Sequence, residues 1–220
     1  MNWMTLIDGP SAAIVFGGTL AATMLRCGLG DCHQTLRALG HLRREGFNAE
    51  RVRSELAVQV QEIQRDGLLR AHPHNFGDRE FDEATEALLE RRTTAALVEK
   101  HEAHKARRLA ISERAVRTLA QAAELAPVFG LAGTLISLSQ LPAEGIARGS
   151  FTGAISMAVV TTLYGLLAAN LLLAPLARVI ERAAQSEEVQ RQRVIDWLTS
   201  QIAADMPQPR PAVPSTRAAA

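Results

Sequence analysis

The uneven placement of charge along the chain is the feature that most constrains its fold. Three intervals, Asp8–Arg26, Glu124–Glu144 and Arg148–Arg178, enclose about 17, about 19 and about 29 residues without a charged side chain. A helix that crosses a bilayer needs about 20 apolar residues. The sequence therefore predicts an all-α membrane protein with three transmembrane helices.

The polar remainder has helical character. Between Arg26 and Pro73 apolar residues recur at helical spacing, and interruptions at Gly46 and Gly67 predict two short amphipathic helices. The stretch from Arg79 to Ala126 holds neither Gly nor Pro, which predicts one helix running unbroken into the second span. We expect the last two membrane helices to extend into a cytoplasmic helical bundle.

These patterns predict a domain order and an orientation. The predicted segments are a first transmembrane helix (1–28), a cytoplasmic helical region (29–118), a second (119–143) and a third (150–178) transmembrane helix, a cytoplasmic helix (179–206) and a disordered Pro-rich tail (207–220). No Lys or Arg precedes Gly9, and Arg148 alone lies between the second and third intervals. The positive-inside rule then predicts a periplasmic N-terminus and a cytoplasmic C-terminus. Because Arg26 follows the first apolar run and no basic residue precedes it, a cleaved signal peptide is disfavoured.

Small residues at regular spacing mark the second and third spans. The repeats are Ala126, Gly130 and Thr134, then Gly133 and Ser137, and in the third span Ala158, Thr162, Gly165 and Ala169. Small faces let membrane helices approach closely. Pro127 can kink its helix. Thr134 and Thr162 could meet across an interface and offer oxygens to an ion or water, although packing alone also explains them.

No Asp, Glu, Lys, Arg or His lies in the central part of any span. A proton path needs a group that titrates, which hydroxyls do not do near neutral pH. The chain alone is therefore not a complete proton carrier, and a partner helix would have to supply the acid.

Other functional classes find little support. His101 and His104 are spaced one residue too closely for a zinc-protease helix, and His72 and His74 flank a proline, so we expect no metal site. No nucleophile, base and orienting acid can be assembled, so we expect neither an enzyme nor a cofactor. A net charge of +1 gives no reason to expect nucleic acid. We expect Cys27 and Cys32 to be reduced.

Three segments carry a resemblance to a known family. "APVFGLAGTLISL" and "FTGAISMAVVTTLYGLLAANLLLAPLA" resemble the last two membrane helices of the MotA/TolQ/ExbB proton-channel superfamily, and "IDGPSAAIVFGGTLAAT" resembles the second membrane helix of flagellar stator A subunits. The resemblance implies a bacterial inner-membrane homopentamer around two copies of a single-pass partner of the MotB, TolR or ExbD kind, whose membrane Asp carries the proton. It implies a channel subunit that uses ion-motive force to move a partner, as in a flagellar stator.

The resemblance also assigns residues. Pro127, Thr134 and Thr162 match the family's Ala-Pro, its Gly-Thr and its polar channel-facing residue, and Pro175 matches the proline near the cytoplasmic end of the last helix. We therefore predict an ion pathway at Thr134, Thr161 and Thr162, and helix packing or gating at Pro127, Gly130, Gly133, Gly165 and Pro175. The adjacent Thr161 and Thr162 are similar to sodium-driven stators, which leaves proton and sodium both open.

The departures from the family leave alternatives. Flagellar A subunits have four membrane helices and this chain is expected to begin at their second, whereas three spans with an outside N-terminus is the layout of TolQ and ExbB. A TolQ/ExbB-like energiser of envelope transport or tethering, or a non-conducting scaffold, is the alternative. Rotor contact is predicted at Arg43, Arg44, Arg65 and Arg70, with a solvated charged face as the alternative.

Overall fold

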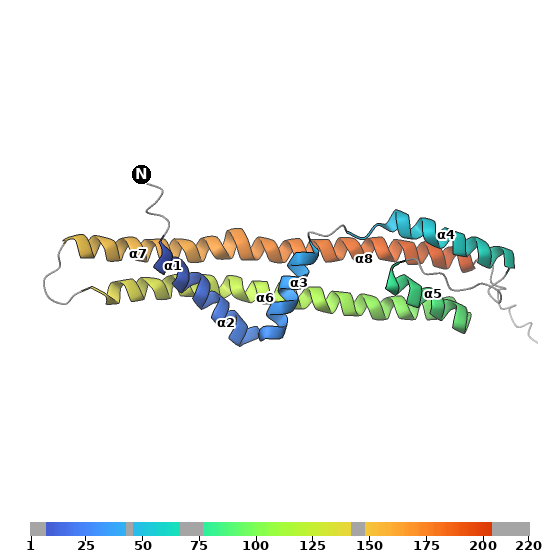
Figure 1. Ribbon diagram of the computed structural model, residues 1–220, viewed down its shortest axis with the longest axis horizontal. Coiled ribbons are helices and arrows are strands. Elements are labelled where there is room, and N and C mark those ends of the chain that lie inside the picture. Colours follow the sequence, from blue (N-terminus) through green and yellow to red (C-terminus); the bar gives the residue numbers. More distant parts are fainter. Residues whose placement is uncertain (1–7, 43–45, 67–76, 142–147, 204–220) are drawn as a thin grey trace, which may run out of the picture. The chain divides into compact units, whose positions relative to one another are not determined.

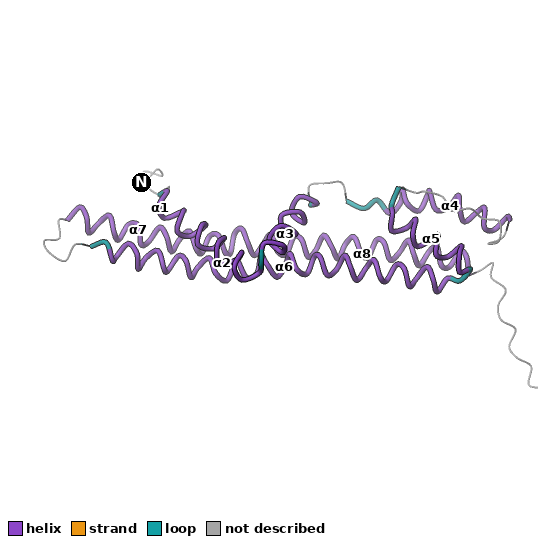
Figure 2. Tube along the Cα trace, turned by 60° about the horizontal axis from the view of Figure 1, so that its bottom comes forward, coloured by secondary structure: helices purple, strands orange, loops and turns teal. Residues whose placement is uncertain are grey.

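The computed structural model describes residues 8–42, 46–66, 77–141 and 148–203, and every regular element in these ranges is a helix. The elements are α1 (Gly9–Ala12), the π-helical η2 (Ala13–Gly17), α2 (Gly18–Cys27), α3 (Leu29–His41), α4 (Ala49–Asp66), α5 (Arg79–Arg91), α6 (Thr94–Ser139), α7 (Arg148–Leu167), the π-helical η3 (Ala168–Leu173) and α8 (Ala174–Ala203) (Figure 1). Figure 2 colours the chain by secondary structure, and its described residues are helices with short teal loops.

Three of the described helical stretches are long and apolar enough to cross a membrane: Gly9–Cys27, Thr94–Ser139 and Phe151–Ala203. Their apolar side chains are largely uncovered, with Leu135 69% and Leu171 71% exposed. Such a surface is far more apolar than water tolerates on a soluble monomer, and hydrocarbon is its natural solvent. The predicted all-α membrane fold with three transmembrane helices is confirmed.

The first span begins and ends at residues that suit helix boundaries. Asp8 has an extended backbone, and its carboxylate accepts hydrogen bonds from the backbone N–H of Ser11, at 3.0 Å, and from the Ser11 hydroxyl. Pro10 lies in the first turn, where no N–H is needed. At the other end Gly28 has φ +86°, a conformation that glycine adopts without steric cost, and the chain turns there into α3.

The described chain divides into two compact units. The first unit takes residues 1–46 and 105–188, and the second takes residues 47–104 and 189–220. Within the first unit α6 and α7 run side by side, as both views show, while α1 and η2 contact α7. One buried cluster of this unit consists of small residues alone, Ala126, Ala168 and Ala169, and a second one mixes Ala115 and Ala177 with the larger Leu119 and Ile180. Small cores are typical of helices held together in lipid by close packing.

The second unit has a core of larger side chains, as a water-soluble helical bundle does. It is built from α4, α5, the beginning of α6 and the end of α8. The most deeply buried members are Leu56, Phe81, Leu88, Leu97, Ile195, Leu198 and Ile202. The rings of Phe47 and Phe81 stack with centroids 5.7 Å apart.

One sequence-based prediction about the helices was wrong. The stretch from Arg79 to Ala126 is not a single helix, because α5 ends at Arg91, Arg92 adopts a left-handed conformation with φ +54°, and α6 starts at Thr94. Neighbouring β-branched threonines favour helix continuation poorly. The break lets α5 turn its buried face, including Phe81 and Leu88, into the core that also contains Leu97 of α6. Burial of that face outweighs the local preference for continued helix.

Other predictions on local structure agree with the helices. The two short amphipathic helices are confirmed as α3 and α4. Helix α6 passes residue 118 and α8 passes residue 178 without a break, so these two predicted segment boundaries fall inside continuous helices. The predicted segment limits themselves remain predictions, and the tail at 207–220 lies outside the described residues.

Candidate ion pathway between the membrane helices

Helices α6 and α7 touch through their backbones at two glycines. A Cβ added to Gly165 would lie 2.6 Å from the carbonyl oxygen of Ala126 and 3.2 Å from the Cα of Gly130. A Cβ added to Gly130 would lie 3.0 Å from the carbonyl oxygen of Thr161. Only residues without a side chain allow this approach, which is how small residues hold membrane helices together. The structure thus brings together two of the residues that the sequence predicts for packing.

Gly133 continues the same contact one turn further along α6. A Cβ there would come within 2.8 Å of the Cβ of Thr161, whose exposed fraction is 0%. The Thr161 hydroxyl donates a hydrogen bond to the Ala158 carbonyl oxygen at 2.9 Å. Thr161 therefore presents its side chain to α6 while its proton is held within α7.

The other two predicted pathway threonines are half-buried. Thr134 donates to the Leu131 carbonyl oxygen at 2.6 Å, and Thr162 donates to the Ala158 carbonyl oxygen at 3.2 Å. Each hydroxyl thus uses its proton within its own helix and keeps lone pairs that can accept. The side chain seated on Gly133 belongs to Thr161, whereas Gly130 faces the Thr162 backbone. An ion pathway along these hydroxyls stays a prediction.

The two predicted prolines occupy different surroundings. Pro127 lies inside α6, and its Cα is 3.1 Å from the position of a Cβ on Gly165. Pro175 is exposed at the start of α8, directly after the π-helical η3. Because proline lacks an N–H and its ring crowds the carbonyl four residues earlier, the wider π turn relieves the conflict at Leu171. Pro127 thus lies at the contact with Gly165, and a packing or gating role of the two prolines stays a prediction.

An open groove of about 360 Å³ lies on the first unit, between α6 and the η3–α8 segment. Alanines form much of its floor, and its polar lining residues are Glu124, Asn170, Arg178 and Glu181. Asn170 is exposed and donates to the Leu166 carbonyl oxygen at 3.0 Å. In the sequence-based prediction Glu124 and Arg178 are only the limits of apolar intervals. Their position as the first charges beyond two adjacent spans is the signal that could have identified this groove.

A polar contact that the sequence did not predict lies at the beginning of the first span. The backbone N–H of Asp8 donates to the Tyr164 hydroxyl oxygen at 3.2 Å, and the Tyr164 ring lies 6.3 Å from that of Phe16. This contact ties the first span to α7. The sequence "DGPS" signals the start of the helix, because Asp followed by Pro and Ser is a helix-start pattern, but it does not signal Tyr164, which is 156 positions away.

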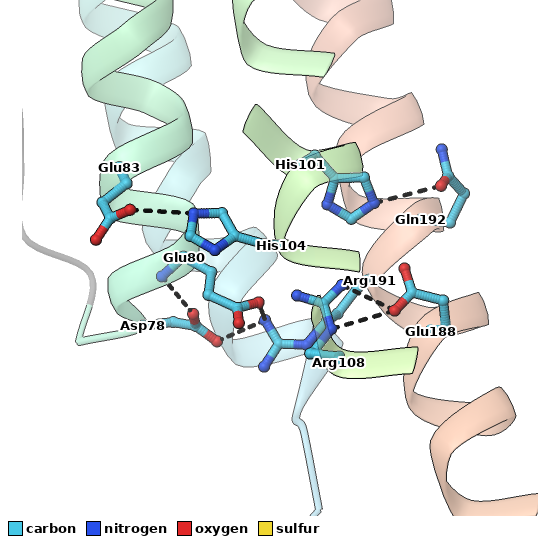
Figure 3. A network of polar contacts seen from close by, with 9 residues as sticks. All are labelled: Asp78, Glu80, Glu83, His101, His104, Arg108, Glu188, Arg191 and Gln192. Carbon is cyan, nitrogen blue, oxygen red and sulfur yellow. Dashed lines mark hydrogen bonds and ion pairs between the residues drawn. The ribbon is translucent and has the colours of Figure 1, made fainter. Parts of the chain in front are cut away.

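The second unit contains a polar network around Arg191 of α8 (Figure 3). Arg191 pairs with Asp78 at 2.9 Å and with Glu80 at 3.4 Å, and its guanidinium lies 4.3 Å from the Phe47 ring centroid. Asp78 also caps α5, since its carboxylate accepts from the Glu80 N–H at 3.1 Å. The network holds α8 to the beginning of α5.

The histidines of "HEAHK" have protein partners. The Nε2 of His101 lies 3.3 Å from the Gln192 amide oxygen, and that of His104 lies 3.1 Å from a Glu83 carboxylate oxygen (Figure 3). Among the described residues no three His, Cys, Asp or Glu side chains are grouped to hold a metal ion. His72 and His74 lie outside the described residues.

The predicted rotor-contact arginines can be placed only in part. Arg65 lies exposed in the last turn of α4. Arg43, Arg44 and Arg70 lie outside the described residues.

Long apolar helices joined at a glycine crossing define an α-helical membrane protein with several spans. A model of the MotA/TolQ/ExbB proton channel family matches residues 68–193. Motility protein A of Cereibacter sphaeroides is 30% identical over 200 residues, which cover 87% of this chain and 76% of that protein. The chain therefore belongs to the MotA/TolQ/ExbB proton channel family, and the predicted resemblance is confirmed.

Two solved structures share the fold. The flagellar MotAB stator complex from Bacillus subtilis matches with a TM-score of 0.81 and 19% identity, over 92% of this chain and 81% of that chain. MotAB of C. jejuni matches with a TM-score of 0.77 and 17% identity, over 93% of this chain and 81% of that one. At these identities the likeness concerns the fold.

Proposed function

We propose that the chain is an ion-channel subunit of a flagellar stator, in which ion flow across the inner membrane drives movement of a partner. The observation that carries the proposal is the crossing of α6 and α7, where Gly130 and Gly165 let the backbones touch, Gly133 meets the buried Thr161 side chain, and no charged side chain takes part. Family membership and the similarity to a motility protein A support the flagellar branch.

The proposed assembly is a homopentamer around two copies of a single-pass MotB-like partner that carries a membrane Asp. The solved neighbours are described as MotAB complexes, which supports a partner of this kind. The chemistry of the spans supports it as well. A charged side chain at the centre of a membrane helix costs about 2.5–3.5 kcal/mol, so a titrating acid is retained only where it works. The described spans hold hydroxyls and the amide of Asn170 instead.

The proposed mechanism follows from a neutral wall facing an acid that changes charge. The oxygens of Thr134 and Thr162 can accept hydrogen bonds from a protonated carboxyl or coordinate a sodium ion, but they cannot neutralise a carboxylate. Loading and release of the ion therefore change the strength of the interaction between the partner's acid and the threonine oxygens. A potential of 100 mV supplies about 2.3 kcal/mol per charge moved, which biases the cycle in one direction.

The proposed orientation has a periplasmic N-terminus and a cytoplasmic C-terminus, with the second unit in the cytoplasm. It is supported by the concentration of Lys and Arg outside the apolar intervals, on the side that the positive-inside rule assigns to the cytoplasm. In this orientation the groove with Glu124, Asn170 and Glu181 is the cytoplasmic mouth, where an ion leaves.

Flux through the reconstituted complex tests the proposal. Proteoliposomes with the chain and its single-pass partner are loaded with a pH-sensitive or a sodium-sensitive dye, and a membrane potential is imposed. Thr134→Val and Thr162→Val together should reduce flux to background while the complex still assembles, because valine keeps the shape and removes the oxygens. Thr23→Val is the matched control, since the Thr23 hydroxyl also bonds within its own helix, to the Thr19 carbonyl oxygen at 2.7 Å, but lies in the first span. Unchanged flux in the double variant would contradict the pathway, and no flux in the unaltered complex would favour a non-conducting scaffold.

A TolQ/ExbB-like role in envelope transport or tethering is the second candidate. The three candidate spans of the described residues favour it, because that family branch has three. A deletion strain separates the two roles. Loss of swimming with an intact envelope supports the stator, whereas envelope leakage or loss of outer-membrane uptake in a swimming strain supports the second candidate.

A further inference from the structure

The first unit contains a second cavity, about one helical turn along from the contact of Ala126 with Gly165. It has a volume of about 350 Å³ and is lined by residues of η2, α2, α3, α6 and η3. Each wall contributes large apolar side chains, among them Phe16, Met24, Leu36, Leu119 and Leu172. This volume falls within the usual range of small-molecule sites.

Three of the four hydroxyls in the cavity wall are satisfied, whereas the buried Thr19 hydroxyl has no hydrogen-bond partner and cannot hold a water molecule by itself. Thr23, Thr35 and Thr118 line it and are at most 5% exposed, and their hydroxyls donate to carbonyl oxygens of their own helices at 2.7, 2.7 and 2.9 Å. A water molecule needs about 2–4 polar partners, and an apolar cavity of less than half this size stays dry and binds benzene. The chemistry of the wall therefore selects an apolar occupant.

The position of the cavity identifies that occupant. Its walls include parts of all three membrane-crossing stretches, and its rim carries Leu20, Leu36 and Leu172, which are 56%, 68% and 50% exposed. The cavity is therefore continuous with the surface that bilayer hydrocarbon covers. A flexible chain of methylenes fits such an irregular apolar space.

Charge near the cavity favours a phospholipid with an anionic headgroup. Exposed Arg37 follows Leu36 of the rim, and exposed Arg117 precedes Thr118 of the wall. Arg26, at the end of α2, is half exposed and only loosely paired with Glu124 at 3.9 Å. Two acidic residues are neighbours as well: Asp31 precedes Cys32 of the wall, and Glu124, the partner of Arg26, follows Ala122 of the wall by two positions. Basic residues at a membrane surface attract anionic lipids by about 1 kcal/mol each.

We propose that this cavity binds one acyl chain of an anionic phospholipid from the surrounding bilayer. The bound chain joins the first span and α3 to α6 and η3. This site lies outside the proposed ion pathway, and the inference does not depend on the stator function.

The two cysteines provide matched probes. Cys32 lines the cavity, and burial raises the pKa of its thiol. Cys27 is equally half-buried but bonds to the Gln121 amide oxygen at 2.9 Å and does not line the cavity. Full-length Cys27→Ser and Cys32→Ser variants are purified in detergent and stripped of lipid, and alkylation by N-ethylmaleimide is timed before and after transfer to vesicles of phosphatidylglycerol.

Lipid at ten times its dissociation constant should slow alkylation of Cys32 about tenfold and leave Cys27 nearly unchanged. Phosphatidylcholine vesicles should protect Cys32 less. Ala122→Phe, which places a ring in the cavity wall, should protect Cys32 without lipid. Since that variant risks misfolding, a photoreactive phosphatidylglycerol with a diazirine in its chain is also irradiated with the unaltered protein, and adducts should map to residues 32–39, 118–122 and 168–173.

Three results would overturn the proposal. These are equal alkylation of Cys32 with and without lipid, adducts confined to residues outside the cavity, and protection that follows protein concentration in detergent instead of lipid. The last result would assign the cavity to a second copy of the chain.

Discussion

Gly165 of α7 lies so close to Ala126 of α6 that a Cβ on the glycine would come within 2.6 Å of the alanine's carbonyl oxygen. The neighbouring atom belongs to the backbone, so no side-chain movement can relieve the contact. The crossing of the two helices is therefore fixed by the absence of a side chain at one position. Any surface that α6 and α7 present jointly to a partner depends on this contact.

Replacing Gly165 with Ala should separate α6 from α7 and destabilise the protein by about 1–3 kcal/mol, as overpacking does. Thermal unfolding in detergent, followed by the loss of the intact species on size exclusion, measures the effect. Gly153→Ala is the matched control on the same helix, because nothing lies within 4 Å of a Cβ there. A stable Gly165→Ala protein with full ion flux would show that the crossing tolerates separation.

Removing the guanidinium of Arg191 should destabilise the second unit. Its side chain is 11% exposed, it pairs with Asp78, whose side chain is 19% exposed, and it stacks on Phe47. Arg191→Ala leaves a carboxylate with little water access, so we expect a loss of about 2–4 kcal/mol. Arg191→Lys should recover only part of this stability, because an ammonium group neither stacks on an aromatic ring nor makes two parallel hydrogen bonds to a carboxylate.

Denaturant unfolding monitored by the fluorescence of Trp197, which packs against the same core, measures this loss. Arg193→Ala, at an exposed position two residues away, should stay within about 0.5 kcal/mol of the unaltered protein. Equal stability of the Arg191 and Arg193 variants would contradict the proposed importance of the network.

The decrease in the free energy of unfolding at acid pH should depend on Glu83. The hydrogen bond from Arg79, at 2.8 Å, lowers the pKa of the Glu83 carboxyl, and the charges of Arg79, His104 and Lys100 lower it further. A folded pKa below the unfolded one stabilises the fold above the ordinary value of 4.5, and that contribution is lost as pH falls through the lowered value. Arg79→Gln should therefore raise the pKa of Glu83 toward 4.5.

Carbon-13 NMR titration of the Glu83 carboxyl measures that change. Arg51→Gln is the matched control, because it removes an equivalent contact one turn apart, with Glu55 at 3.0 Å, on α4. The titration of Glu83 should be the same in this control as in the unaltered protein, and an equal change in both variants would exclude a local effect of Arg79.

Glycine at position 92 should stabilise the break between α5 and α6. Arg92 has φ +54°, which costs a side-chain-bearing residue roughly 1–2 kcal/mol relative to glycine. Arg92→Gly should therefore raise the free energy of unfolding by about 1 kcal/mol, as measured by denaturant titration. Arg91→Gly, within helix α5, should lower it by about 1 kcal/mol. A destabilised Arg92→Gly protein would mean that the arginine side chain holds the turn.

The spans and their glycine faces were predictable because both depend on local composition. Absence of charge over about 20 residues marks a membrane helix, and small residues every four positions mark one face of it. The contact of Gly130 and Gly133 with α7 follows from that face. The choice of Thr161 over Thr162 as the side chain that meets Gly133 does not, because adjacent residues differ by about 100° of rotation that only the packed structure sets.

The features that escaped prediction arise from residues distant in sequence. Arg191 and Asp78 are 113 positions apart, and nothing in either neighbourhood signals the other. The break at Arg92 results from burial of α5 in a core that also includes residues of α4 and α8. Local propensity favoured one long helix, and tertiary burial prevailed.

The π-helical turn at Ala168–Leu173 has a consequence for reading this molecule by helical wheel. A turn of this kind accommodates one additional residue, which rotates everything after it by about 100° relative to everything before. Residues of α7 and α8 that a uniform wheel would place on a common stripe thus point in different directions. For mutational scans and cross-linking on the last helix, the direction in which each side chain points should be assigned separately for the residues before and after that turn.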